Sequence, residues 1–350
     1  MIKKSWILVI LAAITISIPA CSQNSEDVRT FTNPLFLSGA DPWIIYKDSV
    51  YYYTSTSGSN LFICKGGSLD DLKLSIRKVI WTPPAGTTYS KQIWAPELHY
   101  IYGNWYMYFA ADDGKNENHR MYVVENQSAD PFTGTWEFKG KVSDPSDKWA
   151  IDGSVFEYRG KLYFIWSGWE GDVNGQQNIY IARMENPWTV TGTRVLISAP
   201  EHNWETVGDL NNPNDVSHVN VNEGPVALQK NGRLFIIYSA SGCWTDNYCL
   251  GMLTFTGEDD LLNPLSWKKN PLPVFKQKPE ANAYAPGHNS FFKSPNGTEE
   301  WILYHANPAA GQGCGRFRSP RAQKISWNQN GSPNLGEPVN IATSLPLPSE

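Results

Sequence analysis

The chain has 350 residues, more than one ordinary hydrophobic core requires, and its formal net charge is −5. This charge excludes a nucleic-acid-binding protein that works through a general basic field. Hydrophobic residues make up 41% of the chain, which excludes extensive disorder. The 15 Trp, 17 Tyr and 14 Phe residues favour a β-rich fold with flat surfaces on which sugar rings can stack.

The first twenty residues have the pattern of an export signal. Lys3 and Lys4 precede an apolar run over residues 6–18, shorter than the roughly 20 residues that span a bilayer. The run ends in Ile18-Pro19-Ala20-Cys21, which resembles a bacterial lipoprotein cleavage site. We predict a signal peptide over residues 1–20 and a polar tether over residues 21–30 that begins with a lipidated Cys21. The mature protein would be anchored to the outer membrane or a periplasm-facing membrane; an ordinary secretory signal is the alternative.

Export also makes disulfide bonds permissible. The cysteines after Cys21 are Cys64, Cys243, Cys249 and Cys314. Cys243 and Cys249 lie close in the chain and are one candidate bridge, and four buried free thiols are the alternative. No pair has the spacing of a zinc site.

One sequence unit recurs five times within residues 31–350. Each copy has a polar residue, a short apolar strand, a turn with Gly, Asp or Asn, and an aromatic strand, which is a β-hairpin pattern. Two further strands fit after each hairpin, and four-stranded units repeated around an axis form a propeller. We therefore predict a single-domain, all-β, five-bladed β-propeller, with a pair of β-sandwiches as the rival. In chain order the copies begin at Asp41, Glu97, Asp152, Glu223 and His288.

These five starting residues bear on function. The first strand of each propeller blade lines the central channel, so its starting residues converge on one face. Four carboxylates and a histidine gathered there are costly, because like charges repel and burial penalises the charged form. Capping of strand ends explains any one of them but not all five. Clustered carboxylates beside Trp43 and Trp94 are typical of glycosidic-bond hydrolysis. Packing between blades is the alternative role for the two tryptophans.

Four short motifs resemble glycoside hydrolase family 43: Ala40-Asp41-Pro42-Trp43, Trp94-Ala95-Pro96-Glu97, Ile151-Asp152-Gly153-Ser154 and Asn222-Glu223-Gly224-Pro225. The resemblance covers residues 33–345. It implies a five-bladed propeller that hydrolyses arabinofuranosides or xylosides with inversion. It further implies that Asp41 is the general base, that Glu223 is the general acid, and that Asp152 orients the acid and tunes its pKa.

The same resemblance implies supporting residues. Glu97 matches a position beside the substrate pocket, and Arg321 is similar to an arginine that reaches the substrate, with a surface salt bridge as its alternative. His288 is similar to an axial histidine near a cation, commonly calcium held through water, although hard cations prefer oxygen ligands. The chemistry itself requires no cofactor.

Segments 111–122 and 239–249 look like those of arabinofuranosidase-type members. We therefore predict an exo-acting α-L-arabinofuranosidase on plant cell-wall arabinan and arabino-oligosaccharides. A β-xylosidase, or an enzyme of endo-arabinanase or xylanase type, is the alternative within the family. A glycan-binding propeller without catalytic activity is the alternative from another class.

Overall fold

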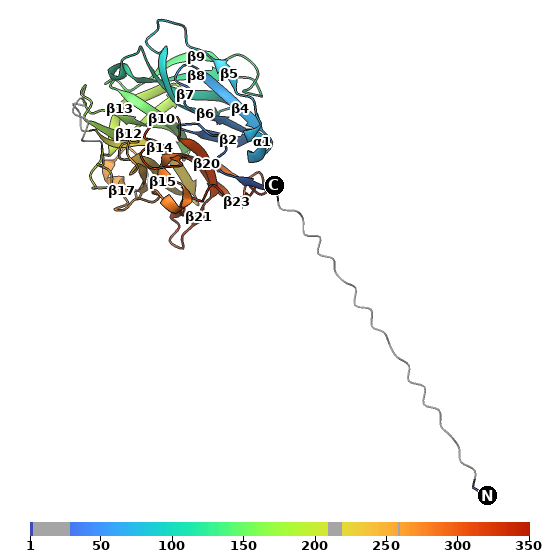
Figure 1. The fold of residues 1–350 in the computed structure, drawn as a ribbon. Coiled ribbons are helices and arrows are strands. Elements are labelled where there is room, and N and C mark those ends of the chain that lie inside the picture. The colour runs from blue at the N-terminus through green and yellow to red at the C-terminus, as the bar shows by residue number, and fades with distance from the viewer. Residues whose placement is uncertain (3–28, 209–218, 258–259) are drawn as a thin grey trace.

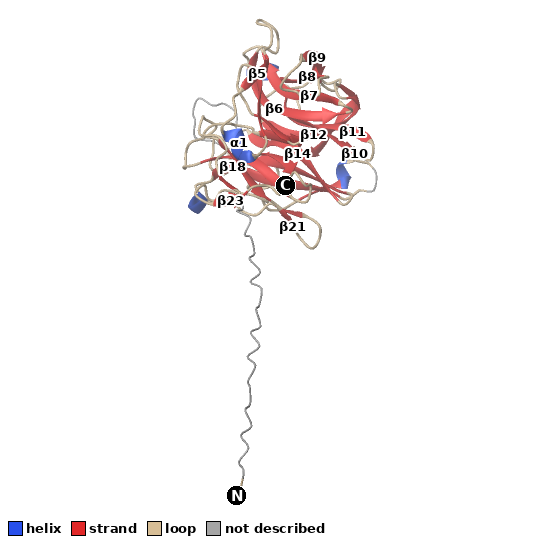
Figure 2. Ribbon diagram, turned by 90° about the vertical axis from the view of Figure 1, so that its right-hand side faces the viewer, coloured by secondary structure: helices blue, strands red, loops and turns tan. Residues whose placement is uncertain are grey.

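The computed structural model describes residues 1–2, 29–208, 219–257 and 260–350. All but the first two residues of the predicted signal peptide, together with Cys21 and nearly all of the predicted tether, therefore lie outside the described residues. Within the described part of the chain, no helix is long and apolar enough to cross a membrane. Strands dominate this part, with the short helix α1 (Leu69–Lys73) between two of them (Figure 2).

The strands form five consecutive antiparallel blades (Figure 1). Blade one consists of β2 (Trp43–Lys47), β3 (Val50–Thr54), β4 (Leu61–Gly66) and β5 (Lys78–Trp81). Blade two consists of β6 (Lys91–Ile101), β7 (Asn104–Asp112), β8 (Arg120–Asn126) and β9 (Glu137–Val142). Blade three consists of β10 (Ala150–Tyr158), β11 (Lys161–Gly168), β12 (Gln176–Asn186) and β13 (Thr189–Ser198). Blade four consists of β14 (Asn220–Lys230), β15 (Arg233–Ala240), β16 (Cys249–Phe255) and β17 (Trp267–Lys269). Blade five is β18 (Tyr284–Lys293), β19 (Glu300–Asn307) and β20 (Ser319–Lys324).

The innermost strands close a ring. Strands β2, β6, β10, β14 and β18 contact one another in chain order, and β18 returns to contact β2. A short parallel pairing of β12 with β14 also joins the third and fourth blades. The predicted all-β, five-bladed propeller is confirmed.

Each gap between neighbouring blades holds its own hydrophobic core. The second strand of a blade is covered by a neighbour on both faces, so its side chains are buried on both sides. Strand β7 is buried from Trp105 to Asp112, and β15 from Leu234 to Ala240. This double burial explains why these strands read as continuous apolar runs rather than alternating ones.

The two ends of the described propeller meet. Strand β1 (Thr30–Thr32) pairs antiparallel with β23 (Ser344–Pro346), so that Phe31 lies opposite Leu345. Phe31 is buried against Trp301 of blade five, with ring centroids 6.0 Å apart. Figure 1 shows the C-terminus beside the start of the propeller. A second small pairing joins β21 (Ser326–Trp327) to β22 (Pro333–Asn334).

Every blade has a left-handed residue near the start of its innermost strand: Asp41, Ala95, Asp152, Gly224 and His288, with φ between 43° and 57°. The inner strands of blades two and five each contain a second one, Gln92 and Ala285. In blades two to five, one extra residue at this point bulges the inner strand against its partner. Such bulges turn side chains away from the regular pleat, and here they turn them toward the axis.

Candidate active site

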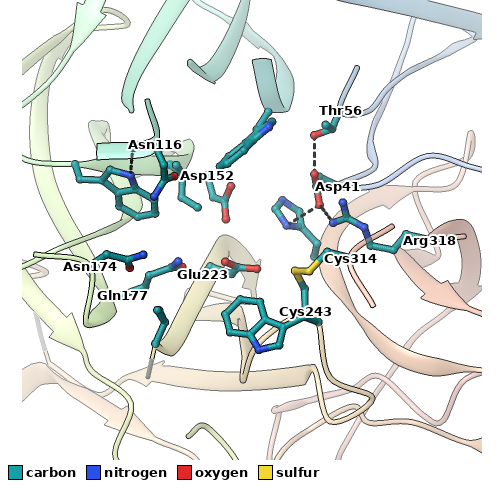
Figure 3. Close-up of a pocket in the computed structure, with 16 residues that line it drawn as sticks. Asp41, Thr56, Asn116, Asp152, Asn174, Gln177, Glu223, Cys243, Cys314 and Arg318 are labelled. Atoms are coloured by element: carbon teal, nitrogen blue, oxygen red, sulfur yellow. Dashed lines mark hydrogen bonds and ion pairs between the residues drawn. A yellow bond between two sulfur atoms is a disulfide. The ribbon is translucent and has the colours of Figure 1, made fainter. Parts of the chain in front are cut away.

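A pocket of about 460 Å³ opens at the axis, and all five blades contribute residues to it (Figure 3). Asp41, Asp152, Glu223 and His288 lie on its wall, as does Trp94. The structure therefore brings together these five residues, which the sequence analysis selected. The other lining residues are Thr56, Asn116, Trp149, Ile151, Asn174, Gln177, Val219, Cys243, Trp244, Cys314 and Arg318.

The Asp41 carboxylate is held by two donors. The Thr56 hydroxyl donates to Oδ2 at 2.6 Å, and Arg318 Nη1 donates to Oδ1 at 3.1 Å. The Thr56 hydroxyl in turn accepts from the backbone N–H of Ala95, so it is oriented toward Asp41. Burial by itself would raise the pKa of Asp41, but the Arg318 cation and the Thr56 hydrogen bond outweigh it and hold this pKa well below its usual range. Asp41 is ionised at neutral pH.

Two histidines complete the surroundings of Asp41. His288 Nδ1 lies 3.3 Å from Asp41 Oδ1, and His305 Nδ1 accepts the backbone N–H of Asp41 at 3.1 Å. Because Nδ1 of His305 accepts, the proton of its neutral ring is on Nε2. Burial lowers the pKa of both histidines, so both rings are neutral at pH 7. The cation that stabilises the Asp41 carboxylate is thus Arg318.

Glu223 and Asp152 form a close pair on the other side of the pocket. Their carboxylate oxygens and a ring nitrogen of His288 lie within 4.8 Å of one another. Tyr248 donates to Glu223 Oε1 at 2.7 Å, and the backbone N–H of Gly224 donates to Asp152 Oδ2 at 3.0 Å. The two carboxyl groups therefore have separate anchors but share one electrostatic environment.

This shared environment favours protonation. Burial raises the pKa of Glu223 to about 7, against the opposing effect of the Tyr248 hydrogen bond and with support from the Asp41 charge. Burial and the neighbouring Glu223 carboxylate raise the pKa of Asp152 well above its ordinary value. Two carboxyl groups this close cannot both ionise without strong repulsion, so they titrate as a pair. The pair retains a proton near neutral pH while Asp41 is already ionised.

Tryptophans shape three sides of the pocket. Trp94 stacks on His119 with ring centroids 4.1 Å apart. Trp149 stacks on Trp169 at 4.6 Å, and its indole N–H donates to the carbonyl of Asn116 at 2.8 Å. Trp244 is 38% exposed. Fixed aromatic faces around carboxyl groups are suited to a sugar ring, which has apolar C–H surfaces between its hydroxyls.

A disulfide forms part of the pocket wall. Cys243, in the loop after β15, is bonded to Cys314, in the loop after β19. The candidate Cys243–Cys249 bridge is therefore wrong, and so is the alternative of four free thiols. Cys249 lies at the start of β16 and is buried as a free thiol, as is Cys64. The bridge joins blades four and five, an interaction that spacing along the chain does not reveal.

Three residues that the sequence analysis placed at the substrate do not line the pocket. Trp43 packs on His99 at 4.7 Å and donates its indole N–H to the Leu98 carbonyl, so it has the alternative role of packing between blades. Glu97 is only 4% exposed and bonds His99 Nε2 at 2.8 Å. It lies two residues beyond the left-handed Ala95, and the bulge places it at the position that Trp43 occupies in blade one.

Arg321 is the third of these residues. It is fully buried in β20 opposite Tyr304, so the surface salt bridge considered as its alternative is also wrong. The arginine that reaches the pocket is Arg318, at the end of the loop that precedes β20. Sequence reasoning also missed Thr56, Tyr248 and Trp244. Trp244 and Tyr248 lie in the segment 239–249, which the analysis singled out as a whole without assigning roles.

The arrangement around His288 bears on a cation. Among the described residues, one group with ligand atoms close enough to hold an ion consists of Asp152, Glu223 and His288. The group offers two carboxylates, the oxygen ligands that calcium prefers, and a single imidazole nitrogen. Calcium held through water near His288 stays a prediction.

Comparisons with known proteins agree with this geometry. A family model described as glycosyl hydrolases family 43 matches residues 31–333. The chain is 38% identical over 343 residues to the extracellular exo-α-(1→5)-L-arabinofuranosidase of Streptomyces avermitilis, covering 95% of this chain and 69% of that protein. It is 35% identical over 340 residues to α-L-arabinofuranosidase 43 of Humicola insolens, covering 95% and 68% respectively. The crystal structure of α-L-arabinofuranosidase from Lactobacillus brevis matches with a TM-score of 0.81 at 37% identity, over 89% of this chain and 98% of that one.

Proposed function

The chain belongs to glycosyl hydrolases family 43 and is a glycoside hydrolase, and from that premise we propose that it is an inverting, exo-acting α-L-arabinofuranosidase. Its substrates are plant cell-wall arabinan and arabino-oligosaccharides. The observation that carries the proposal is the placement of two carboxyl groups with different partners in one pocket: Asp41 is bonded to Arg318 and Thr56, whereas Glu223 lies close to Asp152. These partners lower the pKa of Asp41, and burial raises that of Glu223. The relatives named as arabinofuranosidases support the choice of sugar.

The reaction assigns one role to each carboxyl group. Asp41 removes a proton from a water molecule, which attacks the anomeric carbon on the face opposite the leaving group. Glu223 donates its proton to the glycosidic oxygen as the bond from that oxygen to the anomeric carbon breaks. Asp152 raises the proton affinity of Glu223 by repulsion and orients it. Arg318 and Thr56 keep Asp41 ionised and aimed, and Trp94 offers a face to the sugar ring.

Product analysis tests the activity and its stereochemistry. The purified protein is incubated with α-1,5-linked arabinotriose and with debranched arabinan, and proton NMR follows the first minutes of reaction. From the triose we expect arabinose with arabinobiose as the complementary product, and from debranched arabinan we expect arabinose as the sole early small product. The arabinose should be released as the β anomer. Release of the α anomer would show retention and contradict the mechanism. Internal fragments as the first products would show endo action instead.

A second assay tests the sugar. The p-nitrophenyl α-L-arabinofuranoside and β-D-xyloside are compared at equal concentration. We expect the arabinofuranoside to be hydrolysed at least about tenfold faster, since the two sugars differ in ring size and even one methylene group in a fitted pocket is worth about 1–3 kcal/mol. Activity on the xyloside alone would show that the protein is a β-xylosidase rather than an arabinofuranosidase. Measurable glycan binding without hydrolysis of any substrate would favour a glycan-binding propeller.

Export and anchoring belong to the same proposal. Relatives of this chain are named extracellular, which supports export of this protein. The anchor is a lipid on Cys21, to be tested by metabolic labelling with a fatty-acid probe. Labelling of the wild type and its loss in Cys21→Ala are expected. Wild-type protein that is secreted in soluble form without the label would support export and contradict the lipid anchor.

A further inference from the structure

Tyr248 is the buried partner of Glu223. Its hydroxyl donates to Oε1 of Glu223 at 2.7 Å, and its side chain is fully buried. Glu223 lines the pocket, but Tyr248 does not. Oε1 is therefore engaged on the protein side of the carboxyl group, and Oε2 is the oxygen left to face a substrate.

The ring of Tyr248 is held from two sides. It stacks on His305 at 5.8 Å with an interplanar angle of 3°. On another side it lies against Gly287, where a Cβ atom would stand 2.2 Å from Cε1 of the tyrosine ring. Gly287 thus provides the space in which the ring reaches Glu223. The Cys243–Cys314 bridge fixes the loop that carries Tyr248 to blade five.

We propose that Tyr248 is a positioning residue for the general acid, and this proposal rests on the proposed function. Its hydrogen bond to Oε1 places the acidic proton of Glu223 on Oε2, toward the glycosidic oxygen. In the reaction that proton moves from Oε2 to the glycosidic oxygen, which takes the electron pair of the breaking bond to carbon. Glu223 is left as a carboxylate, and Tyr248 keeps its own proton throughout.

The hydrogen bond also strengthens as the reaction proceeds. A hydroxyl donates more strongly to a carboxylate than to a neutral carboxylic acid, and Glu223 becomes a carboxylate as the proton leaves. An interaction that is stronger in the transition state than in the ground state raises kcat rather than lowering KM. Burial and the nearby Glu223 carboxylate raise the pKa of Tyr248 well above its ordinary value, so the hydroxyl remains a donor.

The variant Tyr248→Phe isolates this bond. It removes the hydroxyl but retains a ring that can stack on His305. The other groups that face Glu223 stay in place, namely Asp152 of β10, Asp41 of blade one, His288 of β18 and Arg318 of the loop after β19. A change in the pH profile of the variant therefore reports the lost bond alone.

Two substrates separate positioning of the acid from a structural role. With α-1,5-linked arabinobiose, whose leaving group needs a proton, we expect kcat to fall about tenfold or more at unchanged KM. With p-nitrophenyl α-L-arabinofuranoside, whose leaving group needs little protonation, we expect a loss of less than about twofold. The lost bond favoured the ionised form of Glu223, so its removal raises the pKa of Glu223. The high-pH limb of the pH profile of kcat/KM, here called the alkaline limb, therefore moves to higher pH by about one unit.

Tyr238→Phe is the matched control. Tyr238 is also fully buried in blade four and donates to a carboxylate, Oε1 of Glu205, at 2.9 Å. Neither Tyr238 nor Glu205 lines the pocket. We expect this variant to lose thermal stability without a shift of the alkaline limb and without dependence on the leaving group.

Equal losses on the two substrates, or an alkaline limb that does not move, would overturn the proposal for Tyr248. Glu223→Gln, measured on the same two substrates, separates this failure from failure of the proposed function. If Glu223→Gln spares the p-nitrophenyl substrate and Tyr248→Phe does not, Glu223 remains the acid and Tyr248 is structural. If Glu223→Gln loses activity equally on both substrates, the acid itself is wrongly assigned.

Discussion

The Asp41 side of the pocket and the Glu223 side treat a carboxyl group in opposite ways. Both groups are buried, and burial alone raises the pKa of each. Each carboxyl group accepts a hydroxyl hydrogen bond that lowers its pKa, from Thr56 and Tyr248 respectively. The two differ in their charged neighbours, because Asp41 bonds the Arg318 guanidinium whereas Glu223 lies beside the Asp152 carboxyl group. Equal burial thus gives a base on one side and an acid on the other, and the partners decide which.

Removing the base should have the largest effect. Asp41→Asn removes the group that activates water, and water is needed whatever the leaving group. We expect kcat/KM to fall by about 10²–10⁴-fold on both arabinobiose and the p-nitrophenyl arabinofuranoside. Steady-state kinetics on both substrates measure the loss. A variant that retained full activity on the p-nitrophenyl substrate would show that Asp41 is not the base.

Removing the acid should discriminate between the substrates. Glu223→Gln cannot donate a proton, so we expect a loss of about 10²–10⁴-fold on arabinobiose but a much smaller one on the p-nitrophenyl substrate. The residual activity of the variant on arabinobiose should also lack the high-pH limb near pH 7 that the wild type shows, because that limb reports the deprotonation of Glu223. A limb that persisted unchanged in the variant would assign it to another group.

Removing the cation beside Asp41 should shift the low-pH limb of the pH profile of kcat/KM. Arg318 lowers the pKa of Asp41, so Arg318→Gln raises it, and activity is then lost at a higher pH as the solution is acidified. The low-pH limb of the kcat/KM profile should therefore move upward, and because Arg318 also lowers the pKa of Glu223, the high-pH limb should move upward with it. Arg318→Lys is the control, since it keeps the charge and should leave the low-pH limb near its original place. Coincident low-pH limbs in Gln and Lys variants would contradict this role of the charge.

Cutting the bridge between the two sides should have the smallest catalytic effect. The loop of Cys243 carries Tyr248, and the loop of Cys314 carries Arg318, so one bond ties the partner of the acid to the partner of the base. The double variant Cys243→Ser/Cys314→Ser should lose about 2–4 kcal/mol in free energy of unfolding and only a few-fold in kcat. Denaturation and kinetics under non-reducing conditions measure both. Cys64→Ser, which breaks no bridge, is the control.

Local patterns allowed part of this molecule to be predicted from the sequence. The blades were predictable because each hairpin carries its own turn residues and apolar strands. Asp41, Asp152 and Glu223 were found because they sit in short motifs on the innermost strands. Glu97 was misplaced because the left-handed residue of blade two that corresponds to Asp41 and Asp152 is Ala95, and Glu97 lies two residues beyond it.

Other parts of the site depend on contacts between loops and strands that are separated along the chain. Arg318 meets Asp41 across 277 positions of the chain, and Tyr248 meets Glu223 across 25. Cys314 pairs with Cys243 rather than with a cysteine close to either of them in the chain. These residues lie in loops whose course is set by tertiary packing, so hydrophobic periodicity carries no signal for them.

Closure of the propeller ring determines when the surroundings of Asp41 are completed during folding. Strands β1 and β23 come from opposite ends of the propeller, and the Asp41 carboxylate takes its cation from blade five. A chain that emerges N-terminus first can shape blades one to four before Arg318 is present, and until then burial is unopposed by that cation. The surroundings of Asp41 are therefore incomplete until blade five has docked, even when most of the strands have formed. Recovery of hydrolysis during refolding would report the moment at which the fifth blade joins the first.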